Sequence, residues 1–174
     1  QTSLEDFERR VGAVLFCEPG DHFGRAVRSL SDPKICGLNN RQFWDDNFRP
    51  LRRAEAEPAD EQLRIVRQAI EHLEACRRDA VVDADLLDSL LFGARRMELH
   101  FQHVVDRLAA ADAYQQALHA EPEQAAALIE RAQSALRKIR ATYADLREQW
   151  HELWLAENKP HALDWSLARY DATV

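Results

Sequence analysis

Two long stretches of the chain repeat apolar or small residues at alternating steps of three and four positions. Because these steps average about 3.5 residues, each series keeps one face of a helix turned towards a neighbouring helix. We therefore predict long helices over residues 83–119 and 122–158. The first series is Leu87, Leu90, Ala94, Met97, Phe101, Val104, Leu108, Ala111 and Leu118, and the second is Ala125, Ile129, Ala132, Leu136, Ile139, Tyr143, Leu146, Trp150 and Leu153.

The segment between the two series is short and contains Pro122. Proline fits the first turn of a helix, where its missing amide donor is not needed. A short connection makes the two helices antiparallel, so the chain is expected to fold back about Glu121 as a coiled-coil-like hairpin. That fold pairs Leu108 with Leu136, Val104 with Ile139, and small Ala94 with bulky Trp150.

The second long helix carries two stop signals at its C-terminal end. Asn158 tolerates the left-handed backbone of a helix cap, and Pro160 cannot continue a helix. We therefore expect this helix to end near residue 158 and a short tail helix to follow.

The N-terminal part predicts shorter helices. Ser3 is typical of a helix cap because an acidic residue follows three positions later, and the first helix should end before the breaker Glu18-Pro19-Gly20. Asp21 is then expected to cap a second helix, and Asn40 a third. The predicted buried faces are Leu4, Phe7, Val11 and Val14, then Phe23, Ala26, Val27 and Leu30, then Phe43, Trp44 and Phe48.

A polar segment that contains Pro58 separates these short helices from the rest of the chain. The next helix, over residues 59–78, should bury Leu63, Val66, Ile70 and Leu73, again at 3-4 spacing. No sustained period-2 alternation predicts a strand. The sequence therefore predicts an all-α protein with a short-helix subdomain over residues 1–55 and a helical bundle over residues 56–174.

Composition narrows the possible partners. A hydrophobic content of 46% indicates a globular chain, and a net charge of -7 argues against nucleic acid as the main partner. No apolar run approaches the roughly 20 residues that cross a bilayer, so no membrane partner is predicted. Gln1 is not an initiator methionine, which indicates a processed product or an excised fragment. Buried or half-buried free thiols are expected for Cys17, Cys36 and Cys76, whose spacing suggests no disulfide framework.

Glu98, His100 and His103 are the one group that invites a metal interpretation. On a single helix they need a further ligand from another helix, and the second long helix supplies no matching Glu-x-x-His pattern. Histidines at a surface or interface are the favoured alternative. We predict no metal, no cofactor and no catalytic residue in this chain.

Aromatic residues are concentrated near the C-terminus. Trp150 belongs to the second apolar series, whereas Trp154 and Trp165 fit that series less well. Tryptophan is enriched at interfaces and also stacks on sugars. Three alternatives follow for these two side chains: burial by a tail that folds back, contact with another domain, or contact with a ligand.

The run Leu-Trp-Leu-Ala-Glu-Asn-Lys-Pro over residues 153–160, followed by Leu163-Asp164 and Arg169-Tyr170-Asp171, resembles the C-terminal end of bacterial glycoside hydrolase family 20 proteins, which are β-N-acetylhexosaminidase-like. The segment Gly20-Asp21-His22-Phe23-Gly24-Arg25-Ala26 is similar to the start of the same region. Lys159 stands where the family commonly has arginine.

The resemblance implies a parent enzyme that removes terminal N-acetylhexosamine with a catalytic (β/α)8 barrel. Because this chain contains no barrel, it implies a non-catalytic helical accessory domain that supports the barrel of the same polypeptide or contacts a homo-oligomer partner. Its interface candidates are Trp154, Glu157, Asn158 and Trp165. Glu157 and Asn158 are equally interpretable as helix-end residues. The alternative is a stand-alone helical adaptor, and the compartment stays open between bacterial cytoplasm and periplasm.

Overall fold

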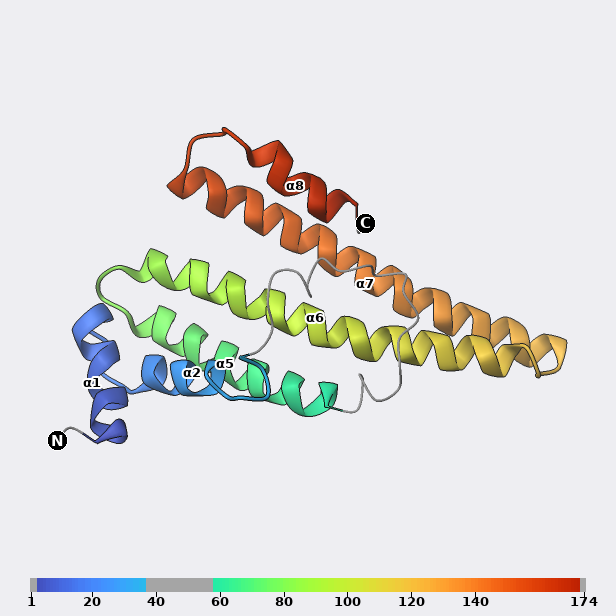
Figure 1. Ribbon diagram of the computed structural model, residues 1–174, viewed down its shortest axis with the longest axis horizontal. Coiled ribbons are helices and arrows are strands. Elements are labelled where there is room, and N and C mark those ends of the chain that lie inside the picture. The colour runs from blue at the N-terminus through green and yellow to red at the C-terminus, as the bar shows by residue number, and fades with distance from the viewer. Residues whose placement is uncertain (1–2, 37–57, 173–174) are drawn as a thin grey trace. The chain divides into compact units, whose positions relative to one another are not determined.

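The computed structural model describes residues 3–36 and 58–172, and these ranges contain helices and no strand (Figure 1). The all-α prediction is therefore confirmed. The predicted short helix with Phe43, Trp44 and Phe48 lies outside the described residues. The helices are α1 (Leu4–Phe16), α2 (His22–Leu30), α5 (Ala59–Asp79), α6 (Ala84–Ala117), α7 (Pro122–Glu157) and α8 (Leu163–Asp171).

Contacts divide the chain into two compact units. Unit 1 comprises residues 1–39 and 61–98, and unit 2 comprises residues 40–60 and 99–174. Helix α6 contributes its first half to unit 1 and its second half to unit 2. The predicted boundary near residue 56 separates a short-helix subdomain from a helical bundle. The division into these two units does not test it, so it stays a prediction.

In unit 1, α1 packs against α2 through an unexpected face. The buried residues of α1 are Glu8, Gly12 and Phe16, whereas Leu4 and Val14 of the apolar series are 63% and 78% exposed. The predicted buried face of α1 is therefore wrong. Apolar spacing marks a stripe on a helix, but which stripe is buried depends on how closely the neighbouring helix can approach.

The reason for this choice of face is a close approach at Gly24 of α2. A Cβ atom at Gly24 would lie 2.3 Å from the carbonyl oxygen of Glu8, so only glycine allows the two backbones to pack at this distance. Arg28 of α2 forms an ion pair with the Glu8 carboxylate, which satisfies the charge that this packing partly buries. Phe16 and Phe23 complete the contact edge to face, with ring centroids 4.8 Å apart.

The first turn of α2 is capped by Glu18 rather than by Asp21. The buried Glu18 carboxylate accepts hydrogen bonds from the backbone amides of His22 at 2.6 Å and Phe23 at 3.2 Å. Asp21 makes no side-chain cap bond and instead pairs with Arg25 at 2.9 Å. A carboxylate at a helix N-terminus satisfies free amide donors and favours the helix dipole, so Glu18 joins the α1–α2 turn to α2.

Helix α5 buries its predicted face, including Val66 and Leu73, which is confirmed. Cys76 on the same helix is buried, and burial first, then the nearby Glu18 carboxylate, raises the pKa of its thiol to about 12. This thiol therefore stays protonated and unreactive at neutral pH. Cys17 and Cys36 are exposed free cysteines, so their predicted burial is wrong.

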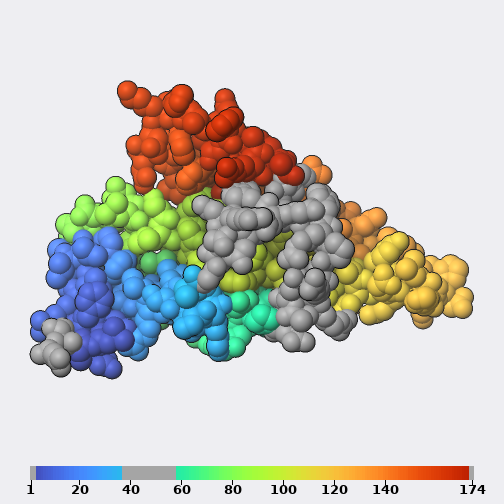
Figure 2. All heavy atoms as spheres, in the orientation of Figure 1, coloured from blue at the N-terminus to red at the C-terminus, as the bar shows by residue number. Residues whose placement is uncertain are grey.

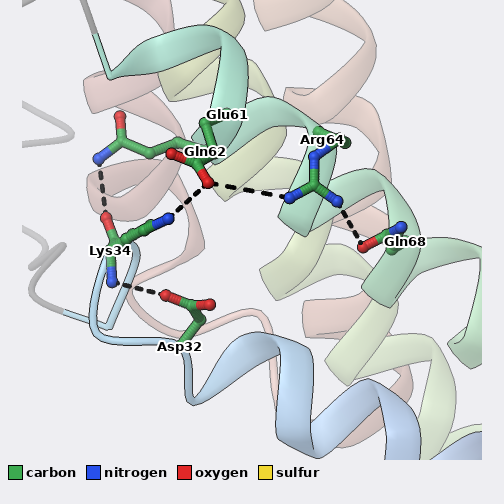
Figure 3. A network of polar contacts seen from close by, with 6 residues as sticks. All are labelled: Asp32, Lys34, Glu61, Gln62, Arg64 and Gln68. Atoms are coloured by element: carbon green, nitrogen blue, oxygen red, sulfur yellow. Dashed lines mark hydrogen bonds and ion pairs between the residues drawn. The ribbon is translucent and has the colours of Figure 1, made fainter.

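A polar network ties the segment after α2 to the start of α5 (Figure 3). Asp32 Oδ1 accepts from the Lys34 amide at 2.8 Å, and the Lys34 carbonyl accepts from the Gln62 side chain at 2.8 Å. The Lys34 ammonium also pairs with Glu61. These contacts hold the turn beside buried Ile35, which is 1% exposed.

In unit 2, the C-terminal half of α6 packs against α7 through alanines. Ala110, Ala113 and Ala132 form the buried cluster, with Leu128 and Ala135 at its edge. Alanine lets helix axes come close together, but it buries little apolar area. The predicted pairing of Leu108 with Leu136 stays a prediction, and Leu136 is 52% exposed.

The buried face of α7 otherwise follows the predicted series, through Ala132, Ile139, Tyr143 and Leu146. Pro122 stands in the first turn of α7, as expected from its missing amide donor. Near the α6–α7 connection the larger apolar side chains face outwards: Tyr114, Leu118, Ile129 and Leu136 are between 42% and 56% exposed.

Candidate interaction surface

Helix α8 folds back along the C-terminal half of α7 (Figure 1). Leu163, Leu167 and Tyr170 recur at steps of four and three along α8 and are buried. The reversal between the helices passes through Ala162, whose φ of 64° is left-handed. This apolar stripe explains why so short a helix is held against α7.

Two polar contacts fix the position of α8 on α7. The indole Nε1 of Trp150 donates to the Ser166 hydroxyl at 2.7 Å. Arg147 pairs with Asp171 at 2.6 Å from its Nε, and this hydrogen bond raises the pKa of the Arg147 guanidinium. Ser166 lies in the middle part of α8 and Asp171 at its C-terminal end, so the two contacts hold this helix at two points along its length.

Replacing Ser166 with alanine is expected to destabilise unit 2 by about 1 kcal/mol, because the half-buried Trp150 indole loses its acceptor. Urea denaturation measures this change, and hydrogen exchange should show faster exchange confined to α8 amides. The matched control is Ser166→Thr, which keeps the hydroxyl. An equal loss of stability in both variants would contradict the importance of this bond.

Trp154 serves the turn that joins α7 to α8. Its indole Nε1 donates to the Lys159 carbonyl at 3.0 Å, and its ring meets Trp150 edge to face with centroids 5.6 Å apart. Asn158 ends α7 with an extended backbone, φ -128° and ψ 160°, so the predicted left-handed cap is wrong. Glu157 and Asn158 are both exposed beside this turn.

Trp165 is the most exposed large apolar side chain among the described residues, with 86% of its surface accessible. It follows the buried Leu163 by two positions, and two helical steps of about 100° each turn it to the opposite side of α8. The alternative in which the folded-back tail buries Trp165 is therefore wrong. The tail does fold back, but Leu163, Leu167 and Tyr170 occupy the contact. Figure 2 shows α8, in red, at the molecular surface.

The two histidines of α6, His100 and His103, lie in unit 2. The Nδ1 atom of buried His103 lies 3.2 Å from the Tyr143 hydroxyl. Burial first, then Arg107 and His100, lowers the pKa of His103 to about 4, while burial also lowers the pKa of His100. Both imidazoles are neutral at pH 7. Within residues 3–36 and 58–172, no three His, Cys, Asp or Glu side chains are placed to hold a metal ion.

Unit 1 holds a second pair of histidines. The His22 and His72 ring centroids are 5.8 Å apart. Burial first, then Arg25 and His22, lowers the pKa of His72. Sequence spacing could not have found this pair, because His22 and His72 lie on helices that are distant in the chain.

The four predicted interface residues therefore divide into two groups. Trp154, Glu157 and Asn158 lie at the turn that joins α7 to α8, whereas Trp165 is exposed on the outer face of α8. Trp150, which the sequence assigned to the hairpin core, is the residue that orients α8. Its indole hydrogen bond gives no signal in the sequence, because Ser166 is an ordinary helix residue.

In the part of the chain that the structure describes, no helix is both long enough and apolar enough to cross a membrane. Comparison with family models, with curated proteins and with solved structures finds no match to this chain.

Proposed function

We propose that this chain is a non-catalytic helical accessory domain of a glycosidase resembling β-N-acetylhexosaminidases, and that it docks on the catalytic barrel of its polypeptide through the outer face of α8. The exposed Trp165 side chain carries this proposal, since it projects from a helix that α7 holds in place. The link to a glycosidase rests on the sequence resemblance over residues 153–171.

The chemistry of this face suits a protein partner. Tryptophan offers a large apolar area and one polar N–H group, and interface tryptophans commonly dominate binding energy. The cost of ordering α8 on docking is small, because this helix is already held by Trp150 and Arg147. Glu157 and Asn158, at the adjacent turn, then contribute to the polar rim of the contact.

The first test is to read the genomic open reading frame around this segment. An upstream region of about 250 residues or more with the alternating strand and helix pattern of a barrel would support the proposal. A start codon immediately before Gln1 would contradict it.

In the isolated 174-residue chain, Trp165→Ala is expected to change the free energy of unfolding by less than about 0.5 kcal/mol, because the side chain is exposed. In the full polypeptide, the same change should loosen the domain contact by about 2 kcal/mol, as for an interface hot spot. Thermal unfolding and limited proteolysis of both proteins measure the difference. Trp165→Phe should retain much of the contact, and Leu155→Ala controls for loss of exposed apolar area. Equal effects in the two proteins would reject a docking role.

The adaptor alternative is favoured by a separate observation. Tyr114 and Leu118 on α6 are 51% and 56% exposed near the α6–α7 connection. A partner that binds there would be independent of α8, and Tyr114→Ala with Leu118→Ala would abolish its binding while Trp165→Ala would not.

A further inference from the structure

The N-terminal half of α7 has an unusual distribution of side chains. Its contact with α6 is built from alanines, while the larger Ile129 and Leu136 are 42% and 52% exposed. Burying the larger side chains would remove more apolar surface from water than burying alanine does. The larger apolar side chains of this half of α7 therefore lie on its outer surface, where their burial would stabilise a contact with a further partner.

The outer surface is a continuous stripe. Ile129, Gln133, Leu136 and Arg140 follow one another at steps of four, three and four, which places them on one side of α7. A hollow of about 310 Å³ lies on this stripe, and its described lining residues are Gln133, Leu136, Arg137 and Arg140. We call these residues, together with Ile129, Glu130 and Glu123, the α7 stripe.

We propose that the α7 stripe is the contact between two copies of this chain, paired antiparallel about a two-fold axis near residues 132 and 133. In that arrangement Ile129 of each copy lies over the partner's Leu136 and enters the hollow beside it. A two-fold contact requires a self-complementary surface, and the apolar pair meets this condition because each member faces the other across the axis.

The charges of the stripe are complementary in the same register. Within one copy, Glu130 and Arg137 form an exposed ion pair on one edge of the stripe. The two-fold axis brings Glu130 beside the partner's Arg137, and Arg137 beside the partner's Glu130. Two attractive contacts therefore form across the axis.

Arg140 gives a further argument for a second copy. Neither the Arg140 side chain nor the Glu123 side chain forms a hydrogen bond or ion pair with another described residue. The same two-fold register places Arg140 near the partner's Glu123, at both ends of the contact. One arrangement therefore pairs the apolar side chains and all the charges of the stripe.

The size of the contact sets the expected strength. Residues 123–140 span about 27 Å at 1.5 Å per residue, so two such stripes bury an area at or below the lower end for stable complexes. We expect a reversible dimer with a dissociation constant on the order of 10 µM. Because charge pairs contribute, the affinity should fall as salt concentration rises.

Sedimentation velocity of the 174-residue chain from about 1 to 300 µM tests the proposal directly, since that range brackets the expected constant. Leu136→Glu should weaken the dimer by about 30-fold or more, because it buries an unpaired charge. Circular dichroism checks that the variant stays helical, as expected for an exposed position. Glu152→Arg, an exposed change elsewhere on α7, is the matched control and should leave the dimer intact.

A charge exchange tests the register. Glu130→Arg alone and Arg137→Glu alone should each weaken self-association by about 10-fold, because like charges then face each other across the axis. Mixing the two variants should restore dimers that contain one copy of each, since one copy then presents two positive charges and the other presents two negative charges. Native mass spectrometry distinguishes the mixed dimer from the self-paired ones.

A chain that stays monomeric up to about 300 µM would overturn the proposal, since that concentration lies well above the expected constant. A dimer unaffected by Leu136→Glu, or a mixture that forms no mixed dimers, would also overturn it. Trp165→Ala should leave dimerisation unchanged, so the dimer and the proposed docking on a barrel succeed or fail independently.

Discussion

Replacing Gly24 with alanine is expected to destabilise the chain by about 3 kcal/mol, even though alanine is the better helix former. Alanine gains about 1 kcal/mol of helix propensity in a helix interior. Against this gain, its Cβ would lie 2.3 Å from the Glu8 carbonyl oxygen and 2.6 Å from the Glu8 Cα. These are backbone atoms, so the clash can be relieved only by moving α1 away from α2.

Gly93 offers a matched control, because it also lies within a helix and nothing lies within 4 Å of a Cβ placed there. Gly93→Ala should therefore stabilise the chain by about 0.5 to 1 kcal/mol. Urea denaturation of both variants at neutral pH gives the two free energies. The same sign for both substitutions would show that α1 and α2 do not approach each other as described.

Lowering the pH from 7 to 4 is expected to remove about 3 kcal/mol of stability through His103 alone. The ordinary pKa of a histidine, 6.5, applies to the unfolded chain, and the pKa of His103 in the folded chain is about 4. The unfolded chain binds a proton on His103 at a higher pH than the folded chain does. The full contribution of neutral His103 to the free energy of unfolding is therefore present above pH 6.5. It is lost progressively as the pH falls from 6.5 to 4 and changes no further below the folded pKa.

Comparison of variants isolates this contribution from that of the carboxylates. His103→Gln should flatten the dependence of unfolding free energy on pH between 6.5 and 4, whatever its effect on stability at pH 7. His100→Gln should flatten it in the same direction, since burial lowers the pKa of His100 too. Urea denaturation at several pH values measures the slopes, and a slope unchanged by His103→Gln would falsify the buried, neutral state of this imidazole.

The acid sensitivity and the alanine-lined contact affect the same part of the fold. His103 and Tyr143 meet on α6 and α7, and Lys138 pairs with Asp106 at 3.3 Å one turn further along the hairpin. The alanine cluster comes next. The stability of the α6–α7 contact therefore depends on polar contacts with defined partners as well as on apolar burial. A second copy bound to the α7 stripe would bury further apolar area next to the alanine cluster, where this contact buries least.

The sequence by itself determined the helical elements. Alternating apolar steps located α5, α6 and α7 to within a few residues, and Pro122 marked the first turn of α7. Ser3 was recognisable as the cap of α1, and its hydroxyl accepts from the Asp6 amide at 3.1 Å. These features are local, because propensity, capping and periodicity depend on residues only a few positions apart.

Only the tertiary structure decided which side of α1 is buried, which side chain caps α2, and which large apolar side chains of α7 and α8 stay exposed. Gly24 beside Glu8 turned the apolar stripe of α1 outwards, and Glu18 replaced Asp21 as the cap of α2. Ala110 and Ala113 of α6 form the buried cluster with Ala132 of α7, while Leu136 of the predicted series stays 52% exposed. On α8, Leu163 and Leu167 are buried and Trp165 is exposed. In each case the decision depends on how closely two helices can approach and on which polar group finds a partner. Those distances join residues far apart in the chain, so no local pattern of the sequence contains them.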